Sequence, residues 1–152
     1  MRNSKTWKWF LICLTAAGVA LVGLGSPQET DPGFRVIVHV ANPTVSATRT
    51  EVSRLMLKKS IDWEDGTDAY PVDLDPSSPV REAFSQVIHG RSTPSIIKFW
   101  QRQVFSGRVV PPPTVGSDEE VVAYVRSHPG GIGYVSPGLR LEGVHELTVI
   151  DQ

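Results

Sequence analysis

Several short runs along the chain have the composition of β-strands. Residues 34–40 are rich in Val and Ile with polar side chains between them, and residues 70–74 alternate apolar and polar positions. Two later runs, 132–136 and 147–150, have the same character. These four runs predict four strands. A Gly-Gly pair at 130–131 precedes the third run; it permits positive φ angles, and we expect the strand to lie in a tight space.

Between these runs, four segments place apolar residues three or four positions apart, so that they fall on one face of a helix. Residues that cap helices stand before the segments, at Thr48, Ser78, Thr93 and Ser117. Pro79 and Pro94 suit the first helical position, where a missing N–H costs nothing. Gly90 and Gly107 then end their helices. The predicted helices run over 49–59, 79–90, 94–106 and 118–127.

Strands that alternate with helices predict an α/β fold, with a sheet covered by helices on its faces in three layers. A length of 152 residues and a hydrophobic share of 40% suit one domain with one core. The third helix is expected to bury an apolar face that extends from Ile96 to Phe105. We place the domain at 34–152.

The first 25 residues have the pattern of an export signal. Three basic residues precede an apolar run over 9–24, and small residues at its end suit cleavage after Gly25. The run is slightly short for a membrane span of about 20 residues, and an uncleaved anchor is the alternative. Residues 26–33 are polar and predict a linker. Either outcome predicts a periplasmic or other extracytoplasmic location for the domain.

Charge and composition exclude several classes of function. A formal net charge of −1 argues against nucleic-acid binding. The only cysteine, Cys13, lies in the predicted signal, which excludes a zinc–thiolate site or a cysteine nucleophile in the domain. The acidic residues of 62–68 lack the spacing of a calcium loop, and the histidines lack catalytic partners at a recognisable spacing. We therefore predict no metal site, no cofactor and no enzymatic activity.

Segment 70–90 contains the candidate binding site. It predicts a strand, a turn of Asp, Pro and Ser residues, and a helix that begins at Pro79. Unpaired N–H groups and the helix dipole favour an anion at such a position. Ser77 and Ser78 add hydroxyl donors, and Arg81 adds a guanidinium group that suits phosphate or carboxylate. Helix capping alone is the alternative explanation of these residues.

Three strings follow the first predicted helix in a characteristic order: SIDWEDG, FWQRQVFSGRVVPPP and VGSDEEVVAYVRSHPGGIGYV. Together they resemble the PstS-like phosphate-binding receptors of ABC transporters, over nearly all of 34–137. The resemblance implies one lobe of a periplasmic-binding-protein-like fold and an exported, non-enzymatic solute-binding function. It also implies phosphate or another small oxyanion as the ligand, and an ABC transporter permease or another envelope protein as a partner.

In that family a Ser-Gly-Thr turn at a helix start binds the phosphate, and an aromatic residue follows along the helix. Ser78 and Phe84 match this pattern, whereas Pro79 and Val80 stand in place of the glycine and the threonine. The loss of a flexible backbone donor and of a hydroxyl predicts weak binding.

Two interpretations follow from the sequence. The first is weak oxyanion binding at the start of the second helix, with Thr48 and Arg108 as weaker candidate ligands. The second is a domain that has kept the fold, lost the ligand and serves as a protein-interaction or sensory module of the envelope. Both limit membrane contact to an uncleaved N-terminal segment.

Overall fold

The computed structural model describes residues 32–151. The predicted export signal at 1–25 and most of the predicted linker at 26–33 lie outside the described residues. Within the described part, no helix is both long enough and apolar enough to cross a membrane.

A four-stranded sheet with the order β3-β6-β1-β7 forms the centre of the domain. Its strands are β1 (Arg35–His39), β3 (Tyr70–Pro71), β6 (Gly131–Val135) and β7 (Val144–Glu146). β1 runs antiparallel to both β6 and β7, and β3 pairs in parallel with β6. The register places Ile37 opposite Gly133 on one side and opposite Glu146 on the other. The first strand thus lies between two strands from the C-terminal part of the chain.

Two shorter ladders form separate two-stranded sheets. β2 (Ser46–Thr48) pairs in parallel with β8 (Thr148–Ile150), and β4 (Asp73–Leu74) pairs in parallel with β5 (Thr114–Val115). β4 continues the path of β3, so the single strand predicted over 70–74 is divided between two ladders. β2, β5 and β7 were not predicted, because runs of two or three residues carry no detectable alternation.

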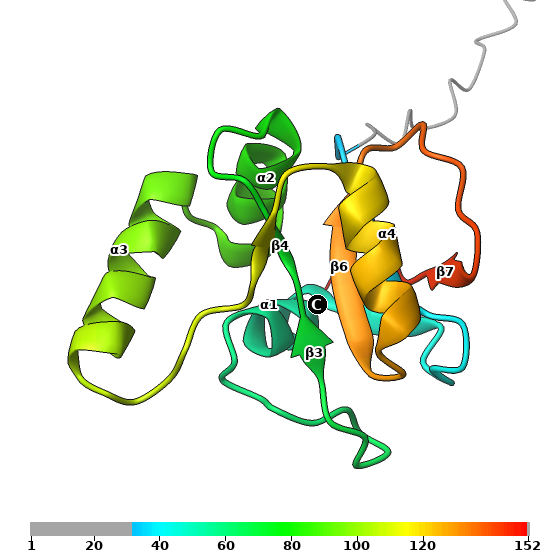
Figure 1. The fold of residues 1–152 in the computed structure, drawn as a ribbon, viewed down its shortest axis with the longest axis horizontal. Coiled ribbons are helices and arrows are strands. Elements are labelled where there is room, and N and C mark those ends of the chain that lie inside the picture. Colours follow the sequence, from blue (N-terminus) through cyan, green and yellow to red (C-terminus); the bar gives the residue numbers. More distant parts are fainter. Residues whose placement is uncertain (1–31, 152) are drawn as a thin grey trace, which may run out of the picture.

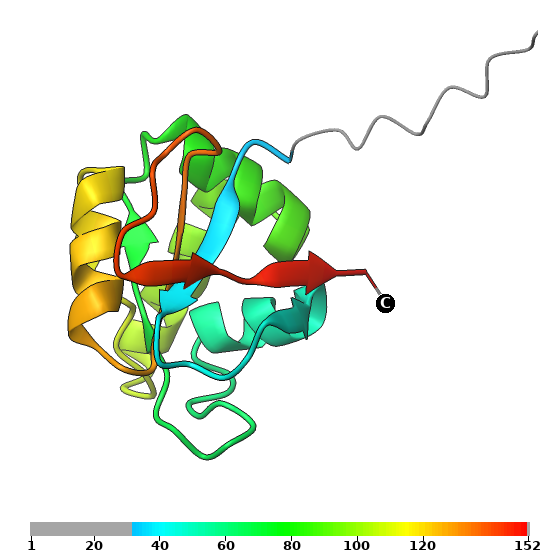
Figure 2. The ribbon, with the colours of Figure 1, turned by 90° about the vertical axis from the view of Figure 1, so that its right-hand side faces the viewer.

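Helices cover both faces of the central sheet, which confirms the predicted three-layer α/β fold (Figures 1 and 2). The helical elements are α1 (Arg49–Met56), α2 (Pro79–Phe84), the π-helix η1 (Ser85–His89), α3 (Thr93–Phe105) and α4 (Asp118–Ser127). α4 packs on β1 and β6 from one side, and α1, α2 and η1 lie on the other. Gly133 permits the close approach of α4, because a Cβ at this position would lie 2.6 Å from Val121 Cγ1.

α3 lies beside the three layers and does not cover the sheet (Figure 1). A small apolar cluster of Leu57, Ile96 and Trp100 attaches it to the rest of the domain. The predicted burial of its whole apolar face is wrong at the C-terminal end, where Val104 and Phe105 are exposed. These two side chains extend past the cluster that holds the helix.

The predicted helix boundaries are correct in part. The capping box of Thr48 and Glu51 is present at the start of α1, but that helix ends at Met56 and not at residue 59. Segment 79–90 changes from α-helix to π-helix at Ser85, and Gly90 ends it in a left-handed conformation with φ 62°.

The expected role of Thr93 is also corrected. Thr93 is the first residue of α3 and not its cap, and its N–H donates to the carboxylate of Glu82 at 2.9 Å. Gly130 and Gly131 do not use the positive φ angles that glycine permits. The close packing predicted at this point is present, because a Cβ on Gly130 would lie 1.8 Å from the carbonyl oxygen of Asp68.

Candidate functional site

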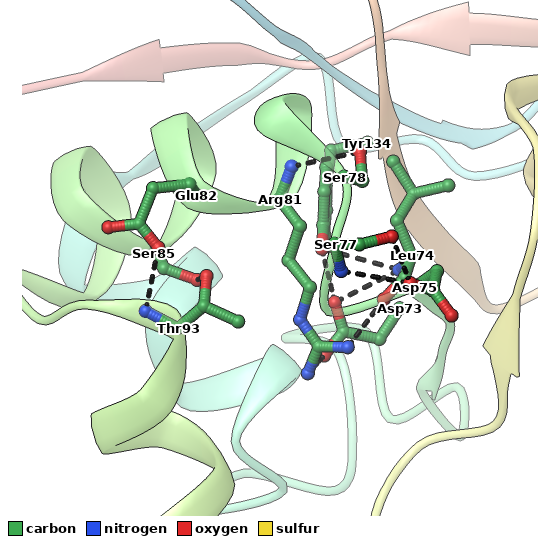
Figure 3. A network of polar contacts seen from close by, with 10 residues as sticks. All are labelled: Asp73, Leu74, Asp75, Ser77, Ser78, Arg81, Glu82, Ser85, Thr93 and Tyr134. Carbon is green, nitrogen blue, oxygen red and sulfur yellow. Dashed lines mark hydrogen bonds and ion pairs between the residues drawn. The ribbon is translucent and has the colours of Figure 1, made fainter.

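A short turn connects the end of β4 to the start of α2, at the position where the sequence predicts an anion site (Figure 3). The carboxylate of Asp75 accepts two hydrogen bonds from Ser77, from the backbone N–H at 2.8 Å and from the hydroxyl at 2.6 Å. The N–H of Ser78 donates to the backbone carbonyl of Asp75 at 2.9 Å. The bonds from Ser77 lower the pKa of the Asp75 carboxyl. The turn therefore carries a negative charge next to the two serines at neutral pH.

Ser78 is the N-cap of α2, and Pro79 occupies the first turn of the helix, as predicted. The Ser78 hydroxyl oxygen accepts a hydrogen bond from the N–H of Arg81 at 3.4 Å. The amide of Val80, in the same first turn, has no acceptor within the helix. The hydroxyl hydrogen of Ser78 and this amide are the donors that an anion above the turn would meet.

The side chain of Arg81 extends from α2 into the interior, below the turn (Figure 3). Arg81 is 4% exposed, and its Nη2 atom lies 2.7 Å from Oδ2 of Asp73. Its Nη1 atom donates to the carbonyl of Leu74, and its buried Nε atom has no acceptor among the described residues. The guanidinium fork that the sequence assigns to an anion is thus engaged by the chain's own carboxylate.

Asp73 is the centre of this buried network. Besides the ion pair, its carboxylate accepts hydrogen bonds from the Tyr134 hydroxyl and from the N–H of Leu74. Burial raises the pKa of Asp73, and the positive charge of Arg81 opposes this effect. Burial, together with the charge of Asp73, also raises the pKa of Tyr134, so the tyrosine remains a hydrogen-bond donor. The Tyr134 ring stacks on Phe84 with centroids 3.8 Å apart, which fixes β6 against α2.

A cleft of about 320 Å³ opens beside the ion pair, between α3 and the proline-rich segment that follows it. Asp73 and Arg81 supply the charged groups of its lining. Trp100 and Phe105 from α3 and Pro112 from the opposite side are among its apolar residues. The cleft therefore offers a mainly apolar wall next to a neutralised ion pair.

The structure brings three of the five candidate residues together and places the other two elsewhere. Ser77, Ser78 and the backbone of Arg81 lie at the β4–α2 junction, whereas the Arg81 guanidinium points into the interior toward Asp73 (Figure 3). The Thr48 hydroxyl caps α1, where it accepts from the N–H of Glu51 and donates to its carboxylate at 2.7 Å. Arg108 is exposed in the turn after α3. Figure 1 shows this turn at the lower end of the molecule and α2 at the upper end.

Two residues that shape the junction, Asp73 and Tyr134, were missed from the sequence, whereas Asp75 forms the predicted turn. A signal for Asp73 existed, because a carboxylate within a buried strand requires a partner and Arg81 follows in the next helix. Tyr134 comes from a strand 61 residues farther along the chain, and no local pattern predicts its contact with Asp73.

No family model matches the sequence, and no curated protein matches it. Solved structures share its fold. An ABC-type phosphate transport receptor from Vibrio cholerae superimposes with a TM-score of 0.60 at 19% identity, over 77% of this chain and 46% of the receptor. A putative phosphate ABC transporter substrate-binding protein with bound phosphate from Clostridium perfringens gives a TM-score of 0.61 at 17% identity. The match covers 77% of this chain and 44% of that protein.

PstS from Borrelia burgdorferi gives a TM-score of 0.52 at 15% identity, over 77% of this chain and 47% of that protein. The chain thus spans less than half the length of the structures that it matches. At these identities the likeness establishes a shared fold.

Proposed function

We propose that this chain, with a fold shared by part of several phosphate receptors, is an exported, non-enzymatic binding protein for a small oxyanion such as phosphate. The observation that carries the proposal is that Ser77, Ser78 and the first turn of α2 lie together at the β4–α2 junction, with the buried guanidinium of Arg81 below them. Hydroxyl donors and a free amide at a helix start, with a guanidinium behind them, are groups that bind anions.

We expect the binding to be weak, because two carboxylates oppose it. Asp75 already accepts both donors of Ser77, and its charge repels an anion at the same turn. Asp73 neutralises Arg81. An anion that is held on one side only also keeps part of its hydration, which limits the affinity unless a second surface covers it.

Calorimetry on the purified full-length chain in mild detergent tests this proposal, with phosphate as ligand and sulfate as the comparison. Asp75→Asn should strengthen phosphate binding about fivefold, because it removes one like charge at a distance of a few ångströms. Ser78→Ala should weaken the binding, and Ser106→Ala, at an exposed serine after α3, is the matched control. Absence of phosphate binding in both the natural chain and Asp75→Asn would show that the proposal is wrong.

The same measurement tests the two weaker candidates. Thr48→Ala and Arg108→Gln should leave the phosphate affinity unchanged, because neither residue contacts the β4–α2 junction in the described chain. A loss of affinity in either variant would move the binding site away from Ser77, Ser78 and Arg81.

The proposal includes an extracytoplasmic location and an ABC transporter permease or another envelope protein as a partner. Cell fractionation of the tagged chain tests the location, and cross-linking in intact cells tests the partner. An equimolar partner found together with no anion binding would instead indicate a protein-interaction module.

A further inference from the structure

The region around α3 carries an excess of positive charge, although the whole chain has a net charge of −1. No acidic residue occurs from 83 to 117, whereas four basic residues do: Arg91, Lys98, Arg102 and Arg108. All four side chains are exposed. The ion pairs of residues 32–151 are formed by other residues, so these four charges are not neutralised within the described chain.

Two of these charges lie on the outward face of α3. Lys98, Arg102 and Phe105 are spaced four and three residues apart and therefore share one side of the helix. The opposite side carries Ile96 and Trp100, which are buried against the rest of the domain. The C-terminal half of the outward face thus carries two basic residues and ends in an aromatic residue.

The C-terminal end of α3 is apolar and protrudes. Phe105 is 92% exposed, Val104 is 54% exposed, and Val110 in the following segment is 74% exposed. Gly107, with φ 66°, turns the chain between them. Figure 1 shows this end of α3 at the edge of the domain, away from the central sheet. Large apolar side chains at such a position are a typical mark of an interaction surface.

We propose that this face of α3 binds the surface of an anionic lipid bilayer. Phe105, Val104 and Val110 enter the headgroup region, while Lys98, Arg102 and Arg108 lie over the anionic headgroups. The combination of a basic helix face with exposed aromatic and aliphatic side chains is that of peripheral membrane helices. This contact does not depend on the N-terminal segment, and it uses none of Ser77, Ser78 and Arg81, although it includes the weaker candidate ligand Arg108.

The charges and the shape favour a bilayer over other occupants. A second copy of the chain bound through the same face would bring two basic surfaces together, which is unfavourable. A fluid bilayer accommodates a protruding apolar tip, whereas a protein partner would need a matching hollow. An acidic protein is therefore an outcome of the test and not the expected occupant.

The test uses the full-length chain reconstituted into vesicles and a fluorescent label next to Phe105. Cys13→Ser removes the only cysteine, and Ser106→Cys then places the label at an exposed position. Nitroxide-bearing lipids quench a label that approaches the bilayer. Every sample contains the N-terminal apolar run, which by itself could bring the domain near the bilayer. A second label site at Glu119→Cys on α4 therefore reports how close the rest of the domain lies to the bilayer.

We expect stronger quenching at 106 than at 119 in vesicles with 30% phosphatidylglycerol, and a loss of this difference in phosphatidylcholine or at high salt. Arg102→Gln with Arg108→Gln should lower the ratio of bilayer-bound to free α3 about 25-fold, since each cation near an anionic surface contributes a factor of about five. Phe105→Ser should lower it about tenfold or more.

Arg49→Gln with Arg140→Gln is the matched control, because it removes the same charge from exposed positions outside α3 and should have no effect. Equal quenching at 106 and 119, or equal quenching in neutral and anionic vesicles, would overturn the proposal. So would capture of an acidic protein by this face when the label at 106 is not quenched by lipid.

Discussion

The guanidinium of Arg81 and the carboxylate of Asp73 lie 2.7 Å apart, in a buried position between β4 and α2. Arg81→Met removes the cation and leaves a buried carboxylate without its partner. We expect this variant to lose about 3–5 kcal/mol of the free energy of unfolding. The double variant Asp73→Asn with Arg81→Met should lose less than the sum of the two single changes. Urea denaturation of the four proteins measures this, and additive losses would contradict a direct coupling.

The Arg81→Met variant should also respond to acid differently from the natural chain. Burial already raises the pKa of the Asp73 carboxyl above its unfolded value of 3.8 against the opposing charge of Arg81, and without Arg81 this pKa rises further. A group with a raised pKa in the folded state contributes stability at low pH that is lost as the pH rises. The variant should therefore recover stability between pH 7 and pH 4 relative to the natural chain. A constant difference across this range would contradict the prediction.

His89 should make the folded domain sensitive to acid. Burial, reinforced by the charges of Lys59, Arg81 and Arg91, lowers the pKa of His89 from 6.5 to about 4. The unfolded chain therefore binds one more proton than the folded chain between these values, and stability falls as the pH falls through this window. The loss approaches about 3 kcal/mol at and below pH 4.

His89→Gln keeps a hydrogen-bonding partner for the Ser53 hydroxyl, which lies 2.9 Å from Nδ1 of His89, and removes the titratable group. Urea unfolding at pH 7.5 and pH 4.5 should show a smaller loss for this variant. His39→Gln, in the first strand, is the control and should retain the loss. If His89→Gln and the natural chain lose the same free energy, His89 is not the group responsible.

Two glycines should respond very differently to alanine. A Cβ on Gly130 would lie 1.8 Å from the carbonyl oxygen of Asp68, so Gly130→Ala forces apart the loop and the start of β6. We expect a loss of about 3 kcal/mol or more, at the upper end for overpacking. Gly66 has φ 81° and no atom near its Cβ position. Gly66→Ala should therefore lower the free energy of unfolding by only about 1–2 kcal/mol, from backbone strain. Thermal unfolding of the two variants tests this order, which a larger loss at Gly66 would refute.

Glu82 should control the stability of the first turn of α3. Its carboxylate accepts a hydrogen bond from the N–H of Thr93. Hydrogen bonding by Thr93, mostly by its side chain, lowers the pKa of Glu82. Glu82→Ala should accelerate hydrogen exchange of the first amides of α3 and leave α4 unchanged. Glu119→Ala, at an exposed acidic residue in the first turn of α4, is the matched control. Unchanged exchange in α3 would show that the apolar cluster alone holds the helix.

The parts of the fold that depend on local chemistry could be predicted from the sequence. Thr48, Ser78 and Ser117 cap their helices because a hydroxyl satisfies an amide within the same turn, and this information lies in four consecutive residues. The three-layer arrangement followed from the alternation of strands with helices.

The features that depend on contacts across the chain could not be predicted in this way. The helical period of 79–90 is the same for an α-helix and for its continuation as η1, so the π-helix has no local signal. In the sequence, Arg81 has the position of a ligand-binding residue. In the structure it pairs with Asp73 from β4, and Asp73 in turn accepts a hydrogen bond from Tyr134 of β6. The oxyanion site at Ser77 and Ser78 stays a prediction, because the cation expected to complete it is paired with Asp73.

The position of β1 between β6 and β7 has a consequence for biosynthesis. Arg35 pairs with Val135, and His39 pairs with Val144, so the first strand has no neighbours until about 100 more residues have left the ribosome. Pairing across such sequence separations is slow, on the order of milliseconds to seconds. The nascent chain therefore spends its synthesis without its central sheet.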